Sequence, residues 1–465
     1  MKTPKYQYRF LARIVIEAKT PLAVGSGDNN VLTDALVATD ANGLPYIPGT
    51  SIAGVVRSMI NDEQLVNNVF GFQKKQDGEG SKIIFTEAKL LNELGNVMDG
   101  LSPTVLANPF LKEYTSLPIR QHVRINERGT AEDKGKFDEQ VVFAGSRFCF
   151  EMEMYAENDN EDKANIKEAL KQICKSSFRL GGGTRCGFGE IDIIDIKFSG
   201  LNLENNLQLY LDKSSNLQES AKWQGWKPYE KSAEKDENWA EYTLILTADD
   251  FLMFGSGFGD EEVDAIPVVE KRVKWTNGKG EFTKELVLIP GTSVKGAIAH
   301  RTAFYYNKLN QRFAGEQGDN RPKVGTDNEA VVALFGKTGK DENGKEKQER
   351  GNVIISDVFA EEEDKLTDKI FDHVAIDRFT GGAVNGALFN EKAFYAKEQK
   401  FIIHILVKKA VLEQDTNIQK AFENALRDIC NGILPLGGAV NKGYGMFSGK
   451  ITCNGENLNL EEVKQ

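Results

Sequence analysis

The chain has 465 residues, of which 40% are hydrophobic and 27% charged, and its net charge is −11. This composition excludes a wholly disordered chain, and the length allows roughly two to four domains. No apolar run reaches the roughly 18 residues that a membrane span needs, and the start MKTPKYQYRF lacks the apolar core of a secretory signal. We therefore expect a cytoplasmic protein without membrane contact. The acidic balance argues against a protein that coats nucleic acid over its whole surface, although binding depends on where the cations cluster.

Cysteine and histidine are too sparse to indicate a metal centre. The cysteines form no C-x-x-C pair and are odd in number: Cys149, Cys174, Cys186, Cys430 and Cys453. Buried free thiols are therefore expected, rather than a disulfide framework or a zinc site. The four histidines are scattered along the chain.

The first half begins with a predicted strand, because apolar residues alternate with more polar ones at Phe10, Ala12, Ile14 and Ile16. A Gly-rich loop then leads to IPGTS, where apolar residues begin to recur at helical spacing. Thr50 or Ser51 is expected to cap this helix.

Short β-rich runs follow at 82–88 and 147–156. A second amphipathic helix comes next, with Ile166, Ala169 and Leu170 on one face, and then a Gly-rich block and a last strand. Polar stretches at 126–139 and 337–351 are expected to be exposed loops.

Four blocks recur in the same order in the second half, with Gly49 of the first copy corresponding to Gly291, 242 residues later. A repeat of this length indicates a domain duplication rather than a solenoid. The paired blocks are 24–30 with 254–260, 44–57 with 287–301, 69–73 and 81–88 with 334–338 and 351–358, and 178–191 with 434–447.

Each half thus has the order β–α–β–β–α–β, the ferredoxin-like pattern that RNA-recognition modules also use. We expect an α+β protein with a first domain at 1–202, a polar linker at 203–240 and a second domain at 241–465. Tryptophans within or beside the linker indicate that it packs against a domain: Trp223, Trp226 and Trp239.

Each half ends with a Gly-rich block, GGGTRCGFG at 181–189 and GGAVNKGYG at 437–445. Glycines let the backbone approach a phosphate, and we place Arg185 and Lys442 at equivalent positions where a cation meets it. The alternative is a tight helix-to-strand turn that requires positive φ. Neither block matches a nucleotide-binding fingerprint.

One aspartate precedes the helix in each half, Asp34 in VLTDALVATD and Asp264 in EEVDAIPVVE. No Ser-His-Asp, Cys-His or HExxH arrangement accompanies them. An isolated carboxylate in a Gly-rich loop is often a solvated loop residue. The pattern alone therefore leaves both a catalytic and a solvated aspartate open.

Residues 119–148 are expected to form a long protruding hairpin, with 373–395 as its counterpart. Arg120 and Arg124 suit a hairpin that reaches along a nucleic-acid backbone. The alternative is a peripheral ribbon that closes a core.

These motifs together resemble the RAMP superfamily, and most closely the backbone subunits of type III CRISPR effector complexes. The resemblance rests on GSG with a following Asp, LPYIPGTSIAGVVR, IDRFTGGA and the terminal LGGG…GFG. It covers nearly the whole chain twice, so the chain resembles a tandem, fused backbone subunit. It implies ferredoxin-like cores with thumb hairpins, and three partners: a CRISPR guide RNA, a single-stranded target RNA and other type III subunits.

The resemblance also implies that a loop aspartate cuts the target RNA where a nucleotide is flipped out of the guide–target duplex. The pattern D-x-x-V-x-x-D-x-x-x-LPxIPG falls on Asp34, and VDAIPVVE gives Asp264 the same role. A carboxylate alone cannot neutralise the charge that develops, so Mg²⁺ or another divalent cation is expected on both aspartates. The neighbouring acids either assist or are solvated: Asp28, Asp260, Glu261 and Glu262.

The guide-binding residues implied by the resemblance lie at the helix start, on the thumb and in the Gly-rich block. They are Gly49, Arg57, Arg124, Gly182 and Arg185 in the first half, and Gly291, Lys295, Arg378, Gly438 and Lys442 in the second. Each half lacks one cation expected near the helix, because Ala53 stands where the second half has Lys295 and Ala299 where the first has Arg57.

The sequence thus predicts an RNA-guided, metal-dependent endoribonuclease subunit with two cutting sites. A non-catalytic scaffold that binds guide RNA is the main alternative. A guide-processing nuclease is disfavoured, because it requires a histidine-based site, and no histidine lies in a first-strand loop or a Gly-rich block.

Overall fold

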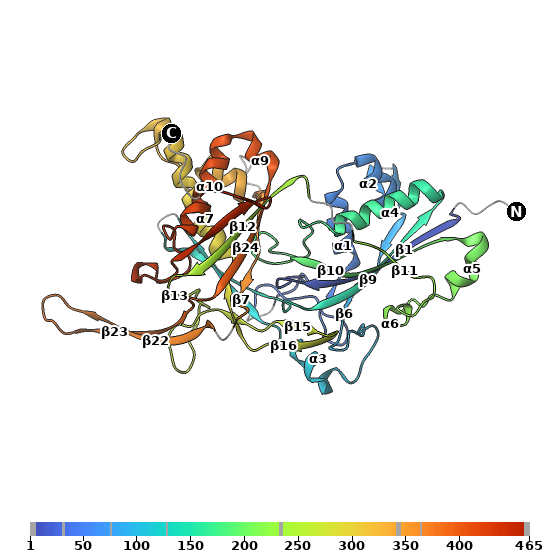
Figure 1. Cartoon of the computed structure of the whole chain (residues 1–465), viewed down its shortest axis with the longest axis horizontal. Helices are drawn as coiled ribbons and strands as arrows, with labels where there is room; N and C mark the ends of the chain where they lie inside the picture. The colour runs from blue at the N-terminus through green and yellow to red at the C-terminus, as the bar shows by residue number, and fades with distance from the viewer. Residues whose placement is uncertain are drawn as a thin grey trace.

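Each half of the chain builds its own hydrophobic core, and the two halves lie side by side (Figure 1). The computed structural model describes residues 6–29, 33–74, 77–126, 129–231, 236–340, 346–362 and 365–459. Across this part of the chain, every helix is too short or too polar to cross a membrane. All five cysteines are free, and Cys149 and Cys430 are buried as expected, whereas the other three are partly exposed.

The first half has an antiparallel sheet centred on β1, whose inward side chains include Phe10 and Ile14. The strand order is β10-β1-β9, with β5 beside β9, and β11, β6 and β2 extend the sheet. The strands are β1 (Tyr8–Ala18), β2 (Tyr46–Ile47), β5 (Ile83–Phe85), β6 (Ala88–Leu90), β9 (Arg147–Ala156), β10 (Ile191–Asn202) and β11 (Lys227–Pro228).

The second half repeats this sheet, with the order β20-β24-β12-β25 and β26 at the edge. The strands are β12 (Trp239–Ala248), β20 (Val353–Ile355), β24 (Lys400–Lys408), β25 (Phe447–Cys453) and β26 (Glu456–Asn457). In both halves the last strand lies beside the first, and the first beside the third, which is the ferredoxin-like order. The predicted α+β fold of two tandem ferredoxin-like units is confirmed.

Two helices cover one face of each sheet, α1 with α4 and α7 with α10. They are α1 (Gly49–Met59), α4 (Asp159–Ile173), α7 (Gly291–Leu309) and α10 (Thr416–Cys430). The prediction that Thr50 or Ser51 caps α1 is wrong. Pro48 is the cap residue, and no side chain caps the helix, so Thr50 and Ser51 lie within its first turn.

A long hairpin, which we call a thumb, leaves each half between the second and third strands of its sheet (Figure 1). The first thumb is β7 (Ile119–Ile125) with β8 (Ala131–Gln140), and the second is β22 (Thr367–Ile376) with β23 (Ala383–Tyr395). The stretch 126–139 is therefore mostly thumb strand rather than loop. The stretch 337–351 lies largely in a second hairpin, β18 (Gly336–Lys340) with β19 (Glu346–Arg350).

Short elements connect these main parts. They are α2 (Glu63–Phe70), β3 (Phe72–Lys74), β4 (Asp77–Glu79), α3 (Pro109–Glu113), α5 (Leu203–Leu211), α6 (Leu217–Ser220), β13 (Phe251–Leu252), β14 (Val269–Glu270), β15 (Val273–Thr276), β16 (Lys279–Phe282), β17 (Leu286–Ile289), α8 (Glu329–Phe335), β21 (Val358–Phe359) and α9 (Lys409–Gln414).

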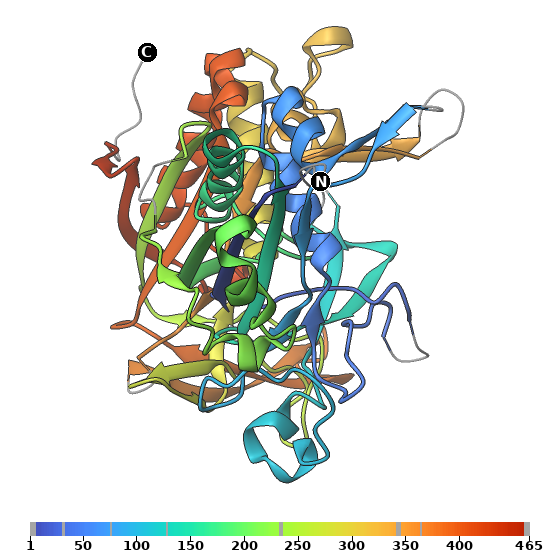
Figure 2. The same ribbon diagram turned by 90° about the vertical axis from the view of Figure 1, so that its right-hand side faces the viewer.

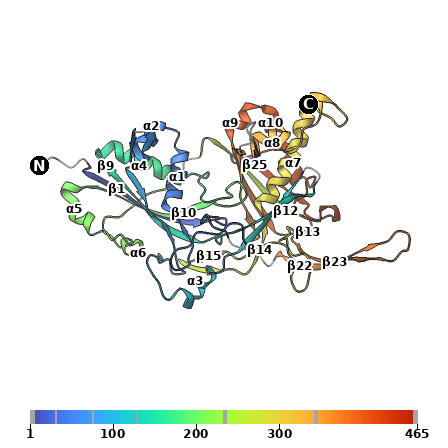
Figure 3. The same ribbon diagram turned by 180° about the vertical axis from the view of Figure 1, so that it is seen from behind.

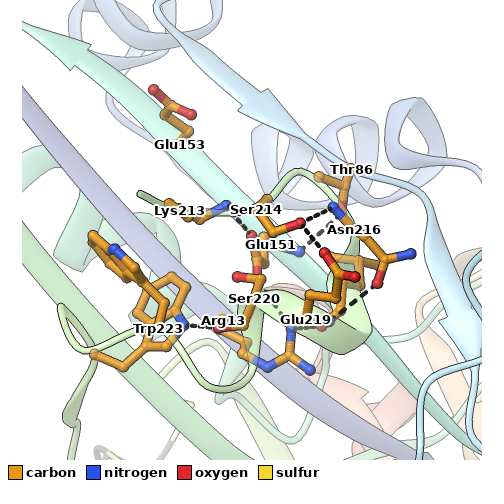
Figure 4. Close-up of polar contacts among 12 residues, drawn as sticks. Arg13, Thr86, Glu151, Glu153, Lys213, Ser214, Asn216, Glu219, Ser220 and Trp223 are labelled. Carbon is orange, nitrogen blue, oxygen red and sulfur yellow. Dashed lines mark hydrogen bonds and ion pairs between the residues drawn. The ribbon is translucent and has the colours of Figure 1, made fainter. Parts of the chain in front are cut away.

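The segment that carries α5 and α6 packs on the face of the first sheet opposite α1 and α4, and it lies nearest the viewer in Figure 2. Its anchor is Glu151 of β9 (Figure 4). This buried carboxylate accepts hydrogen bonds from Arg13 at 3.0 Å and Ser220 at 2.6 Å, and it pairs with Lys213 at 2.6 Å. Trp223 packs beside it on Leu11. The first part of the predicted linker thus covers the first sheet.

The β15–β16 hairpin of the second half inserts into the core of the first half. Val273 is part of that core, and the Phe282 ring lies 5.1 Å from Phe110 and 5.6 Å from Tyr114 between ring centres. Trp275 donates its indole N–H to the carbonyl of Gly145 at 2.8 Å. The first core is therefore completed by residues of the second half.

A buried ion cluster joins the halves at a second point. Arg120 of the first thumb donates to Glu270 and to Asp357, both at 2.6 Å. Burial by itself lowers the pKa of Arg120, but the two carboxylates outweigh it and raise the pKa above its usual value. The Arg120 guanidinium also lies 4.9 Å from the ring of Phe188. The junction thus contains a permanently charged arginine.

We expect the Phe282→Ala variant to lower the free energy of unfolding by about 3 kcal/mol, since an aromatic side chain leaves a cavity in the first core. Lys279→Ala, at the exposed tip of the same hairpin, should change it by less than about 0.5 kcal/mol. Urea titration with a probe in the first half, such as intrinsic Trp223 fluorescence, measures both. Equal effects of the two variants would contradict the insertion.

Candidate active sites and nucleic-acid interface

The loop aspartate of the first half is tied to its own thumb. The carboxylate of Asp34 accepts the backbone N–H of Asp138 at 3.0 Å, and the carboxylate of Asp138 accepts the backbone N–H of Asp34 at 2.9 Å. Asp34 is exposed. The loop therefore presents a positioned carboxylate to solvent beside the base of β8.

The second half repeats this arrangement with an amide in place of the second carboxylate. The carboxylate of Asp264 accepts the backbone N–H of Asn390 at 2.9 Å, and the Asn390 side-chain oxygen accepts the backbone N–H of Asp264 at 2.8 Å. Asp264 is exposed as well. Sequence reasoning found both aspartates but missed Asp138 and Asn390, which lie more than a hundred residues away.

A histidine–glutamate pair lies next to each of these ties. His122 pairs with Glu139 at 3.0 Å, and His373 pairs with Glu391 at 2.9 Å. Glu139 directly follows Asp138, and Glu391 directly follows Asn390. The backbones of these glutamates form isolated β-bridges to Ala35 and Ala265, the residues after the two loop aspartates. The sequence reading set these histidines aside because they lie outside the loops and Gly-rich blocks, although the strand pairing of the thumbs brings both beside the loop aspartates.

The Gly-rich blocks pack against the segment that follows the first strand in each half. The N–H of Gly182 donates to Ala23, and that of Gly438 to Met253, both at 2.7 Å. Gly49 and Gly291 both lie too close to other backbone atoms to carry a side chain. A Cβ at Gly49 would lie 2.3 Å from the carbonyl oxygen of Phe85, and one at Gly291 would lie 2.8 Å from Gly187 Cα.

Arg185 and Lys442 do not occupy equivalent positions. When the two blocks are aligned on their glycines, Gly187 matches Gly443, and Lys442 matches Cys186 rather than Arg185. Lys442 lies at the base of the second thumb, 3.0 Å from Glu391 and 3.2 Å from His373. Arg185 instead points to the junction and donates to the carbonyl of Gly351 in the second half.

A groove of about 790 Å³ runs between the halves, over α1 and the first Gly-rich block. Thr50 and Ser51 of the first helical turn line it. Six cations line it against three carboxylates: Lys175, Arg179, Arg185, Arg350, Lys408 and Lys409 against Asp236, Glu237 and Glu413. A concave surface with this excess of positive charge, in a chain of net charge −11, suits a polyanion. The sequence reading missed all of these cations except Arg185, because they come together only across the junction.

The Arg185 guanidinium keeps its charge in this groove. Burial lowers its pKa to about 10, and Arg350 acts in the same direction. At neutral pH the side chain is therefore still a cation that a phosphate can approach.

The remaining predicted RNA-binding residues are spread over the surface. Arg57 is exposed on the last turn of α1, and Lys295 of α7 lies 3.9 Å from the Cys186 sulfur. Arg124 lies on the first thumb, 3.6 Å from Glu132, and Arg378 is exposed at the tip of the second thumb. Neither half therefore gathers all its predicted cations into one cluster.

Glu190 makes part of the junction pH-dependent. Burial raises its pKa, but Arg179, Lys19 and a hydrogen bond from Ser356 outweigh this and lower the pKa to about 2. A carboxylate whose pKa is lower in the folded chain than in the unfolded chain stabilises the fold at pH values above the unfolded pKa, near 4.5. That stabilisation is lost as the pH falls toward 2.

We expect the difference in unfolding free energy between the unmodified chain and Glu190→Gln to be about 3 kcal/mol at pH 6 and to shrink between pH 5 and 2 (about 1.4 kcal/mol per pKa unit). Urea titrations over this pH range measure it. Glu285→Gln, which removes an exposed carboxylate, should show no such trend. A constant difference for Glu190→Gln would contradict the buried ion pair.

The described residues contain no group of three His, Cys, Asp or Glu side chains that would hold a metal ion. A carboxylate beside a second oxygen donor, Asp138 or Asn390, supplies part of a Mg²⁺ site, since Mg²⁺ in nucleic-acid enzymes often takes one or two carboxylates together with substrate phosphates. The donor chemistry therefore fits Mg²⁺ only when RNA contributes ligands.

Comparison with known proteins agrees with the repeated architecture. The family model of the RAMP superfamily matches residues 15–192 and 245–448. The chain is also 27% identical over 195 residues to the CRISPR system Cms endoribonuclease Csm3 of Methanocaldococcus jannaschii, and this alignment covers 38% of the chain and 72% of that protein. The chain belongs to the RAMP superfamily, with one RAMP unit in each half.

Proposed function

We propose that the chain is a tandem backbone subunit of a type III CRISPR effector complex, which binds guide RNA and cuts the complementary target RNA at Asp34 and Asp264. The observation that carries this proposal is the repeated tie between an exposed loop aspartate and the second strand of its thumb. The similarity to an endoribonuclease of a CRISPR system supports it.

The groove at the junction is the proposed path of the guide backbone. Its lining cations come from both halves, so a strand in the groove contacts both RAMP units at once. The thumbs then reach beyond this path with Arg124 and Arg378, and Lys442 lies at the second thumb base. Arg57 and Lys295, on the helices that follow the aspartate loops, extend the proposed contacts.

Cleavage at such a site follows from the chemistry of RNA. In a flipped-out nucleotide the 2′-oxygen attacks the adjacent phosphorus, the aspartate takes the 2′-OH proton, and the 5′-oxygen leaves with a proton from solvent. The products are then a 2′,3′-cyclic phosphate and a 5′-OH. If water attacks instead, the 3′-oxygen leaves and the products are a 3′-OH and a 5′-phosphate. A Mg²⁺ held by Asp34 with Asp138, or by Asp264 with Asn390, would neutralise the charge that develops on the phosphate.

Guide binding is expected to weaken in the double variant Lys408→Ala/Lys409→Ala, and in the single variants Arg378→Ala and Lys442→Ala. Each lost phosphate contact should reduce the slope of log K against log salt by about 0.7, the value for single strands. Fluorescence anisotropy with labelled guide RNA at several salt concentrations measures this. Lys279→Ala, on the hairpin tip outside the groove, is the matched control. Unchanged affinity and slope in all three variants would remove these residues from the path.

A scaffold that binds guide RNA without cutting is the second candidate function. It is favoured by the hydrogen bonds that the carboxylates of Asp34 and Asp264 accept from the thumb backbone, which give both residues a structural role without catalysis. Incubation of the guide-bound complex with a labelled complementary RNA, with and without chelator, separates the two. Cuts that disappear with chelator support the nuclease, and intact target at full binding supports the scaffold.

A further inference from the structure

The internal junction shows how one RAMP unit of this chain receives the thumb of its neighbour. The first thumb lies on the loop 254–260 of the second half. Lys136 Nζ lies 5.3 Å from the centre of the Phe258 ring. A Cβ at Gly257 would lie 2.6 Å from the side-chain oxygen of Gln121. The thumb and the loop are therefore in close contact.

The second thumb has no such neighbour among the residues that the structure describes. It projects away from both halves (Figures 1 and 3). Its exposed side chains include large apolar ones. Phe379 is 99% exposed, Leu388 73% and Ile376 62%. Apolar side chains gathered on a projecting hairpin are typical of a surface that docks on another protein.

The docking residues of the two thumbs differ in kind. In the first thumb Arg120 lies opposite Glu139, and in the second thumb Phe371 lies opposite Glu391. Phe371 therefore occupies the position of the arginine that forms the ion cluster. In the same register Leu388 replaces Lys136. Phe371 packs within its own half, 5.0 Å from the Phe251 ring. The second thumb thus offers the exposed apolar side chain of Leu388 where the first offers Lys136, and it has no cation at the position of Arg120.

The receiving surface also differs at the free end of the first half. The loop 24–30 matches 254–260, so Asp28 stands where the second half has Phe258. Likewise Asp40 of the first half corresponds to Glu270 of the second half, and Glu87 corresponds to Asp357. If a second copy docked in the same way, Leu388 would cover the exposed charge of Asp28 and no arginine would reach Asp40, whereas Glu87 already pairs with Lys89 at 2.6 Å. Burial of unpaired charge opposes such a contact.

Within the described ranges, the inserted hairpin and its receptor occur only at the internal junction. The second half has residues 271–285, which carry the hairpin, between Glu270 and β17, whereas the first half passes from Asp40 to β2 through a short turn. Phe110 and Tyr114, which receive Phe282, lie between β6 and β7. In the second half β21 and β22 are joined by the short segment 360–366.

We propose that the second thumb, residues 367–395, docks on a RAMP subunit of different sequence, which presents an apolar side chain where this chain has Phe258, and not on a second copy of this chain. The inference rests on the proposed function, because it places the chain within a row of RAMP subunits. Each effector complex then holds no directly adjacent pair of these chains.

Photo-crosslinking tests the docking partner. The full-length chain with benzoylphenylalanine in place of Leu388 is assembled with guide RNA and the other RAMP subunits of its effector complex, and the crosslinked peptides are identified by mass spectrometry. We expect a crosslink to a RAMP subunit of different sequence. The same probe in place of Leu207, which is 51% exposed on α5, is the matched control and should not crosslink to that subunit.

A crosslink from position 388 to residues 24–30 of a second copy would overturn the inference, and so would the absence of any crosslink in an assembled complex. Sedimentation velocity of the chain alone and with guide RNA gives a second readout, in which stepwise head-to-tail oligomers would also overturn it. Guide affinity and target cleavage are measured on the same samples. A complex that binds and cuts but crosslinks to itself refutes only the inference, whereas a chain that binds no guide refutes the proposed function as well.

Discussion

Asp34→Ala is expected to abolish one of two cuts in a target RNA bound by the guide-loaded complex, and Asp264→Ala the other. Loss of a general base or metal ligand should slow cleavage at that position by about 100-fold or more. Target affinity should stay unchanged, since each carboxylate is exposed. Each substitution removes one of the two hydrogen bonds to the thumb and keeps the other, which the backbone N–H of residue 34 or 264 donates. Single-turnover cleavage of an end-labelled target, resolved on a sequencing gel, measures both positions in one experiment.

The two losses should be independent, because each site uses its own flipped nucleotide. Asp28→Ala and Glu261→Ala are the matched controls, since they remove neighbouring exposed loop acids, and both should cut at every position. Chelator should stop both cuts of the unmodified protein. If both aspartate variants still cut at every position with normal rates, the scaffold function becomes the better account.

Arg120→Ala is expected to lower the free energy of unfolding by about 3–5 kcal/mol, the usual cost of removing one partner from a buried ion pair. The change leaves the carboxylates of Glu270 and Asp357 buried without a cation. Their side chains are 6% and 0% exposed, so water does not replace the lost charge. Because the cluster joins the halves, both cores should unfold at lower denaturant concentration, as measured by urea titration with circular dichroism.

Arg124→Ala is the matched control on the same thumb strand. Its side chain is 61% exposed, and its removal should change the free energy of unfolding by less than about 0.5 kcal/mol. The triple variant Arg120→Met/Glu270→Gln/Asp357→Asn removes all three charges and should recover much of the lost stability, since buried ion clusters are often replaceable by neutral groups. A stability of Arg120→Ala equal to that of Arg124→Ala would contradict the cluster.

The repeat, the main strands and helices and the fold of each half could be read from the sequence, whereas the hairpin strands within 126–139 and 337–351 could not. Alternation at Phe10 to Ile16 and helical spacing in the second helix are local patterns, and a strand or helix needs only its own residues to show them. Recurrence of the same blocks after Gly49 and Gly291 then required no knowledge of contacts. The same local patterns placed Asp34 and Asp264 in equivalent loops.

The partners of those aspartates could not be read in this way. Asp34 meets Asp138 across 104 residues, and Asp264 meets Asn390 across 126. Asp138 and Asn390 differ in side chain, and the pattern they share, Phe-Asp-Glu at 137–139 and Phe-Asn-Glu at 389–391, is too short to be specific on the sequence. Their common position follows from the pairing of each thumb with its loop, which exists only in the folded chain.

The junction between the halves depends on contacts over still longer separations. Arg120 reaches Glu270 across 150 residues and Asp357 across 237. On the sequence, these three residues and the groove cations look like ordinary charged surface positions, and Val273, Trp275 and Phe282 of the β15–β16 hairpin carry no sign of which core they enter. They become a buried cluster, a core insertion and a binding groove because two sheets of the same fold pack against each other, and no periodicity within either half encodes that packing.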